Sequence, residues 1–163
     1  MRARRAIAAG IIAIAAGGAV AGCGGAGDAA TTTPAADAGF VAEANGICAA
    51  ATAEFNALGN TQQFQSLEDF RDRFGKAIAI ARRQYADISQ LDPPPEIAND
   101  VTAYLEEGGR SVQMTEDLYN RVLAGEDLDV AEGATIGSAE GRSIIAARRA
   151  AAAEAGLSDC AAS

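Results

Sequence analysis

Histidine is absent from the 163 residues of this sequence. Histidine is the commonest general base and a frequent metal and haem ligand, and the Glu-x-x-His di-iron sites of helix bundles require it. The Ser-x-x-Lys and Gly-x-Ser-x-Gly motifs are also missing, and the single lysine, Lys76, has no serine at helical spacing. The sequence therefore predicts a protein that is not an enzyme and that has neither a cofactor nor a metal.

Basic residues are few, with 13 Lys and Arg against 22 Asp and Glu, which gives a net charge of −9. A chain of this charge without a basic cluster is repelled by nucleic-acid phosphates and by anionic lipids. We therefore expect no nucleic-acid partner. The single lysine beside many arginines, together with abundant alanine, is typical of GC-rich coding, as in actinobacteria.

Residues 6–21 are the longest apolar run, and they contain only Ala, Ile, Val and Gly. At about 16 residues the run is at or below the length that a helix needs to span a bilayer. Arg2, Arg4 and Arg5 precede it, and Val20-Ala21-Gly22-Cys23 closes it with small residues, which is the pattern of an export signal. The whole segment resembles a bacterial lipoprotein signal peptide with its lipobox.

This interpretation predicts removal of residues 1–22 and attachment of a diacylglycerol to Cys23. Two acyl chains suffice for stable membrane attachment, so we expect a lipid-anchored protein on the extracytoplasmic face of the cell membrane. The mature chain then has 141 residues and a net charge of −12, because the signal contains three basic and no acidic residues. The alternatives are an uncleaved signal anchor or a secreted protein cut elsewhere, and Arg4-Arg5 leaves twin-arginine export open.

The mature chain is predicted to consist of a lipidated cysteine and flexible linker, residues 23–38, followed by one domain, residues 39–163. Three cysteines are present, and Cys23 is assigned to the lipid. Cys48 and Cys160 remain, an even number in an oxidising compartment, which predicts a disulfide bond between them. The alternative is a pair of unpaired buried thiols.

Apolar residues recur in steps of three and four from residue 39 onward, which predicts helices and no strand of useful length. Four segments follow, at about residues 39–58, 67–90, 96–124 and 130–155. Ser66 and Asp69 resemble a capping box, and Gly156 with Leu157 forms a helix-ending signal. We therefore predict an all-α, up-down-up-down four-helix bundle closed by one disulfide, with the tail after Gly156 folded back toward Cys48.

Three glycines, Gly133, Gly137 and Gly141, are spaced by four residues in the fourth segment. On one continuous helix they share a face with Val130 and Ile144, which predicts that this face points inward. The face would allow close packing of a neighbouring helix, or would form a pocket floor or a dimer contact.

Tyr85, Tyr104 and Tyr119 lie on apolar stripes of the second and third segments. We expect residues at the edge of the core whose hydroxyls reach solvent. If the bundle contains a ligand pocket, these tyrosines and the three glycines are its predicted lining.

Acidic residues gather between residues 126 and 132. Their spacing does not fit an EF-hand, which requires ligands at alternating positions and a glycine at the sixth. We interpret them as the start of a helix, where the helix dipole favours negative charge.

Three short stretches carry a family resemblance: FVAEANGICAAA at residues 40–51, LDPPP at 91–95 and AGLSDC at 155–160. They resemble a family of small actinobacterial secreted proteins and lipoproteins, in which a first-helix cysteine and one near the C-terminus bracket a helical bundle. The resemblance covers the chain from about residue 40 onward. It supports the disulfide and the bundle, and it implies no activity.

The function class favoured by these patterns is a non-enzymatic binding or interaction module of the cell envelope. The alternatives are a small-molecule carrier with a pocket between helices and an enzyme of unrecognised type. A pocket with a few convergent polar groups would favour the carrier, whereas a flat exposed apolar patch would favour a protein partner in the envelope.

Overall fold

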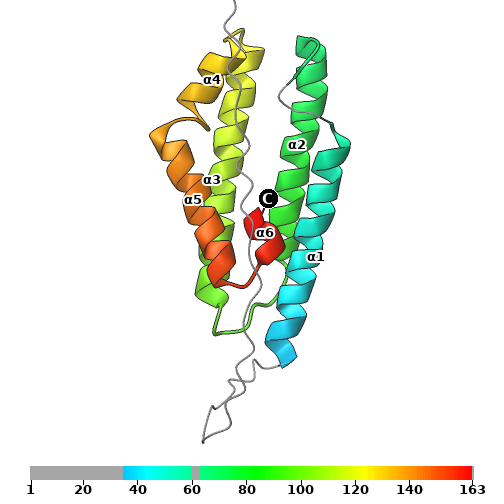
Figure 1. The fold of residues 1–163 in the computed structure, drawn as a ribbon, viewed down its shortest axis with the longest axis vertical. Coiled ribbons are helices and arrows are strands. Elements are labelled where there is room, and N and C mark those ends of the chain that lie inside the picture. Colours follow the sequence, from blue (N-terminus) through cyan, green and yellow to red (C-terminus); the bar gives the residue numbers. More distant parts are fainter. Residues whose placement is uncertain (1–34, 60–62, 163) are drawn as a thin grey trace, which may run out of the picture. The chain divides into compact units, whose positions relative to one another are not determined.

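The computed structural model describes residues 35–59 and 63–162, and the regular structure in these ranges is entirely α-helical. The predicted signal peptide, the predicted lipidation site Cys23 and residues 24–34 of the predicted linker lie outside the described residues. Six helices follow one another within these described ranges (Figure 1): α1 Ala35–Ala57, α2 Leu67–Ile88, α3 Ala98–Leu123, α4 Leu128–Ala134, α5 Ala139–Glu154 and α6 Ser158–Ala162. The all-α prediction is confirmed. These ranges contain six helices where four segments were predicted, because the fourth segment is divided into α4 and α5 and the tail forms α6.

The start of α2 follows from local side-chain chemistry. The hydroxyl of Ser66 accepts a hydrogen bond from the backbone N–H of Asp69 over 3.1 Å, which satisfies one of the unpaired donors of the first turn. The carboxylate of Asp69 accepts in turn from the N–H of Gln65 over 2.9 Å. This is a variant of the predicted capping box, in which the returning bond goes to the residue before the cap.

The end of α5 turns the chain back into the bundle. Gly156 has a φ of +72°, and the N–H of Leu157 donates to the carbonyl of Ala152 over 2.8 Å, which is a Schellman motif. The chain after this turn forms α6, in which Cys160 is buried and bonded to Cys48 with 5.1 Å between their Cα atoms. The predicted disulfide and the folded-back tail are therefore confirmed.

The fourth predicted segment is interrupted at residues 135–138, between α4 and α5. The hydroxyl of Thr135 donates to the carbonyl of Ala131 over 2.7 Å, and the hydroxyl of Ser138 accepts from the N–H of Gly141 over 2.9 Å. Such hydroxyl groups compete with the helical hydrogen bonds, and the neighbouring glycines weaken the helix further. Val130, predicted to face inward, is 58% exposed on the separate α4.

The long helices pack side by side around two groups of buried residues. α3 packs against α2 and α5, α1 packs against α2, and α6 contacts both α1 and α5 (Figure 1). One group surrounds the disulfide and includes Phe40, Ala44, Ile88, Val101, Tyr104 and Leu157. The other consists of Phe70, Leu118, Val122 and Ala131, with Phe64, Phe74 and Tyr119 packed against it. Within the part of the chain that the structure describes, no helix has the length and apolarity of a membrane span.

Candidate functional site

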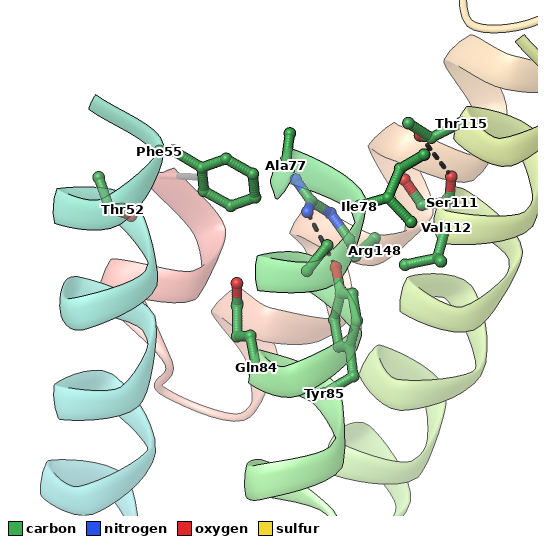
Figure 2. A pocket seen from close by; sticks show the side chains of 11 residues that line it. Thr52, Phe55, Ala77, Ile78, Gln84, Tyr85, Ser111, Val112, Thr115 and Arg148 are labelled. Carbon is green, nitrogen blue, oxygen red and sulfur yellow. Dashed lines mark hydrogen bonds between the residues drawn. The ribbon is translucent and has the colours of Figure 1, made fainter. Parts of the chain in front are cut away.

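A cavity of about 340 Å³ lies midway along the helices, between the two buried groups. Residues of α1, α2, α3 and α5 form its wall (Figure 2). The lining consists of Thr52, Phe55, Ala77, Ile78, Ala81, Gln84, Tyr85, Ser111, Val112, Thr115 and Arg148. The wall is mostly apolar, with a few polar groups at defined places, which is the usual make-up of a small-molecule site.

The cavity exists because small residues occupy positions that face the centre of the bundle. α2 contributes Ala77 and Ala81, and α3 contributes Ser111 and Thr115, each pair spaced by one helical turn. The same two helices carry Phe70 and Leu118 in the buried group on one side and Ile88 and Tyr104 on the other. Large side chains therefore hold α2 and α3 together in the two buried groups, and the small side chains between these groups leave the space of the cavity.

Tyr85 and Arg148 form the main polar pair of the cavity wall. The Arg148 guanidinium on α5 donates from Nη1 to the hydroxyl of Tyr85 on α2 over 3.1 Å (Figure 2). The ring of Tyr85 lies directly against Gly108 of α3, where a Cβ atom would meet the ring at 2.3 Å. This contact explains why a glycine stands in the middle of α3. Gly108 makes room for the ring of Tyr85, whose hydroxyl accepts the hydrogen bond from Arg148.

Gln84 connects the cavity wall to the disulfide. Its side chain is 4% exposed, and Nε2 donates to the hydroxyl of Tyr104 over 3.0 Å and to Sγ of Cys48 over 3.1 Å. The Tyr104 hydroxyl lies 3.7 Å from the same sulfur, and a disulfide sulfur has no hydrogen, so the hydroxyl is the donor in that contact. Burial raises the pKa of Tyr104 above its ordinary value, so the phenol stays neutral.

The three predicted tyrosines have different surroundings. Tyr85 lines the cavity, whereas Tyr104 is 0% exposed beside it and does not form its wall. The prediction that the Tyr104 hydroxyl reaches solvent is therefore wrong, because Gln84 supplies the hydrogen-bond partner that water was expected to provide. Tyr119 lies in the other buried group, where its ring stacks on Phe70 and Phe74 with centroids 5.7 and 6.2 Å away.

The three predicted glycines do not share a helix face. Gly133 is exposed on α4, Gly137 is exposed in the break, and Gly141 is buried near the start of α5. At Gly141 a Cβ atom would lie 2.3 Å from the carbonyl oxygen of Thr135. This glycine therefore permits residues 135–138 to pack closely against the start of α5. None of the three lines the cavity between α1, α2, α3 and α5.

Sequence reasoning missed Gln84 and Arg148, although both carry a recognisable signal. Gln84 lies three residues after Ala81 and four before Ile88, and Arg148 lies four residues after Ile144. Each is therefore a polar residue at a position where the helical period requires an apolar one. A long polar side chain at such a position indicates a buried hydrogen-bond network or a site.

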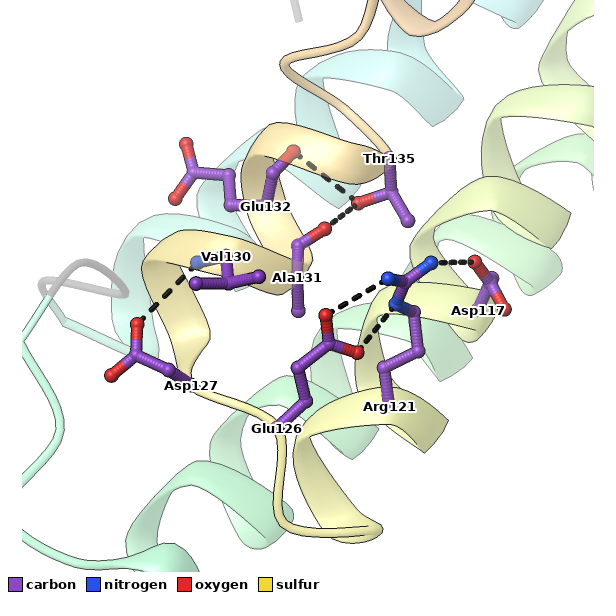
Figure 3. A network of polar contacts seen from close by, with 8 residues as sticks. All are labelled: Asp117, Arg121, Glu126, Asp127, Val130, Ala131, Glu132 and Thr135. Carbon is purple, nitrogen blue, oxygen red and sulfur yellow. Dashed lines mark hydrogen bonds and ion pairs between the residues drawn. The ribbon is translucent and has the colours of Figure 1, made fainter.

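The acidic stretch after α3 forms ion pairs and a helix cap (Figure 3). Arg121 donates to both carboxylate oxygens of Glu126, over 2.7 and 2.9 Å, and also lies 3.7 Å from Asp117. Asp127 accepts from the N–H groups of Asp129 and Val130, and so caps α4. The interpretation of these acids as a helix start is confirmed. The described residues contain no group of three or more potential metal ligands.

The Arg121–Glu126 pair predicts a pH-dependent contribution to stability. The hydrogen bond from Arg121 lowers the pKa of Glu126 below its ordinary value. Because the folded-state pKa is the lower one, the pair stabilises the fold above the unfolded pKa of about 4.3, and this contribution disappears as the pH falls through the folded pKa. Glu126→Gln is therefore expected to lower the free energy of unfolding at pH 7, and wild type and variant should converge near pH 2, measured by urea denaturation.

Glu43→Gln is the matched control, because Glu43 is exposed on α1 and no ion pair is found for it among the described residues. It makes the same change in net charge. A Glu126→Gln effect that equals the Glu43→Gln effect at every pH would contradict a specific role for the pair.

No family model, no curated protein and no solved structure matches this chain.

Proposed function

We propose that this protein is a lipid-anchored, extracytoplasmic binding protein of the cell envelope that holds a small, mostly apolar molecule between its helices. The cavity of about 340 Å³ between α1, α2, α3 and α5 carries this proposal. In this proposal α1, α2, α3 and α5 act as an up-down-up-down four-helix bundle, and α6 with the disulfide joins the end of α5 to α1.

The size and chemistry of the cavity favour a small molecule over a protein partner. Small-molecule sites typically have volumes of about 300–1,000 Å³ and a few placed polar groups in an apolar wall. A protein-docking face would instead require a contiguous exposed apolar patch. The large exposed apolar side chains of the described residues are Leu67 at the start of α2 and Val130 on α4, on different helices.

The proposed location rests on the sequence. The signal-peptide pattern and Cys23 support membrane attachment through lipid, and the family resemblance agrees with secretion and an oxidising environment. The Cys48–Cys160 bond is of the kind that persists outside the cytoplasm. A cavity in a protein held at the membrane surface is well placed to exchange apolar molecules with the bilayer.

Ala81→Leu should abolish binding by filling the cavity from α2. The test uses the full-length protein in phosphatidylcholine vesicles and a decanol that carries a photoreactive diazirine. We expect saturable labelling of peptides from residues 77–85 or 111–115, competed by unlabelled decanol and reduced about tenfold or more in the variant. Mass spectrometry of the labelled peptides provides the measurement.

Ala86→Leu is the matched control, because Ala86 is exposed on the same helix and outside the cavity lining. It should label like wild type. Labelling that is unsaturable, or equal in both variants, would contradict the proposed function. A specific protein crosslink without cavity labelling would favour the interaction module instead.

A further inference from the structure

The amide oxygen of Gln84 is a buried acceptor in the cavity wall that has no donor within the described residues. The side chain of Gln84 is 4% exposed, and its Nε2 has two acceptors, the Tyr104 hydroxyl and Sγ of Cys48. For its Oε1 no hydrogen bond is found in residues 35–59 and 63–162. Figure 2 shows this oxygen at the end of the side chain, directed toward Phe55. A buried carbonyl oxygen without a donor costs free energy, so it indicates a ligand that supplies one.

The disulfide determines which end of the amide faces the cavity. A disulfide sulfur has no hydrogen, so it can accept from the amide nitrogen but cannot donate to the amide oxygen. The Tyr104 hydroxyl donates its hydrogen to the same sulfur, and its own oxygen accepts from Nε2 over 3.0 Å. Both neighbours therefore require the nitrogen of Gln84 on their side, 3.1 Å from Sγ of Cys48. The oxygen is consequently held on the side of the cavity.

We infer that the ligand is an uncharged aliphatic alcohol whose hydroxyl donates a hydrogen bond to Oε1 of Gln84; this inference rests on the proposed function. Phe55, Ile78 and Val112 provide the apolar surface for its chain. A hydroxyl brings the one donor that the acceptor requires. An amide would bring a second N–H and a carbonyl oxygen, and burial of these groups without partners costs free energy.

The same acceptor disfavours charged head groups. A carboxylate is ionised at pH 7 and has no hydrogen to donate to Oε1. An ammonium could donate, but among the described residues that line the cavity there is neither an Asp nor a Glu to balance its charge. Transfer of an unpaired charge into an apolar space is costly. A hydroxyl satisfies the acceptor and brings no charge.

The volume sets the length of the chain. A water molecule occupies about 30 Å³ in the liquid, and a methylene group is of similar size. The cavity of about 340 Å³ therefore holds roughly eleven such units. An alcohol of about ten carbons matches this space, whereas a full-length membrane acyl chain exceeds it.

The test compares two photoreactive diazirine probes with equal numbers of non-hydrogen atoms, a decanol and the methyl ether of a nonanol. The ether keeps the oxygen and loses the hydroxyl hydrogen. Both are applied at neutral pH to the full-length protein in phosphatidylcholine vesicles, and their concentrations in the vesicles are measured. We expect the alcohol to reach half-maximal labelling of the cavity peptides at a concentration about tenfold lower, because only the alcohol satisfies the buried acceptor.

Gln84→Leu should remove this preference, because leucine has no acceptor to offer the hydroxyl. Gln113→Leu is the matched control, because Gln113 is exposed on α3 and does not line the cavity. It should keep the preference of wild type. Circular dichroism and thermal denaturation of both variants check that they are folded.

The outcomes separate the inference from the proposed function. Saturable labelling by both probes with the same half-maximal concentration in wild type would overturn the inference and leave the proposed function standing. A full preference for the alcohol in folded Gln84→Leu, or stronger competition by decanoate or decylamine than by decanol, would also overturn the inference. Absence of saturable cavity labelling by either probe would overturn both. The wild-type comparison decides the matter even if Gln84→Leu fails to fold.

Discussion

Replacing Cys48 and Cys160 together by alanine is expected to lower the free energy of unfolding by about 4 kcal/mol. The bond joins residues that are 112 positions apart, so in the unfolded chain it closes a loop that spans nearly the whole described domain and restricts its conformations. The chain-entropy model gives roughly 4.7 kcal/mol for a loop of about this length. Both sulfurs are also buried, and Cys48 accepts the hydrogen bond from Gln84, so packing and polar contacts are lost as well.

Urea denaturation of the oxidised wild type, the reduced wild type and the double variant measures this effect. The reduced wild type keeps both sulfur atoms and loses only the crosslink, so it isolates the chain-entropy contribution from the packing change. We expect both forms to be much less stable than the oxidised protein. A loss below about 1 kcal/mol in the reduced form would contradict the proposed role of the crosslink.

Gly108→Ala is expected to destabilise the protein, whereas Gly109→Ala at the next position should stabilise it. At Gly108 the new Cβ would lie 2.3 Å from Cε1 of Tyr85, and that ring is held by Tyr104 and by the hydrogen bond from Arg148. Overpacking of this kind costs about 1–3 kcal/mol or more. At Gly109 nothing lies within 4 Å of the new atom, so the higher helix propensity of alanine should contribute about 1 kcal/mol.

Thermal or urea denaturation of the two variants tests the packing of Tyr85 on α3. The pair is well matched because both substitutions add one methyl group in the middle of the same helix. Combining Gly108→Ala with Tyr85→Ala should cost less than the two single changes together, since the clash disappears with the ring. Similar effects at both glycines would show that Tyr85 does not occupy the position described.

The helix boundaries that depend on local chemistry were predictable from the sequence. Ser66 with Asp69 begins α2, and Gly156 with Leu157 ends α5, because the residues that form each signal are close neighbours in the chain. The disulfide was predictable for a different reason, since Cys48 and Cys160 are the two cysteines left after Cys23 is assigned to lipid.

The break before α5 was missed because its glycines imitate a helical pattern. Gly133, Gly137 and Gly141 are spaced by one helical turn, and this spacing suggested one continuous face. The hydroxyls of Thr135 and Ser138 form hydrogen bonds with the backbone, and the helix is interrupted between them. Because Ser138 caps α5, the helix begins there and does not continue from α4, although the glycine spacing fits one helix.

The cavity was not predictable from any single helix. Ala77 and Ala81 fit an ordinary apolar stripe, and only the alignment of α2 with α3 brings them level with Ser111 and Thr115. Tyr85 was included among the expected pocket residues, whereas Arg148 and Gln84 were not. The pairing of Tyr85 with Arg148 depends on contacts between residues 63 positions apart.

The disulfide also determines how the protein responds to mechanical tension. The backbone from Cys48 to Cys160 and the S–S bond form a closed covalent ring that contains α2, α3, α4 and α5. A pulling force applied between Phe40 and Ala161 enters through α1, crosses the S–S bond and leaves through α6, so it bypasses the ring. The helices inside the ring, including most of the cavity wall, therefore carry no load while the bond is intact. Reduction of the bond would transfer the whole force to their packing.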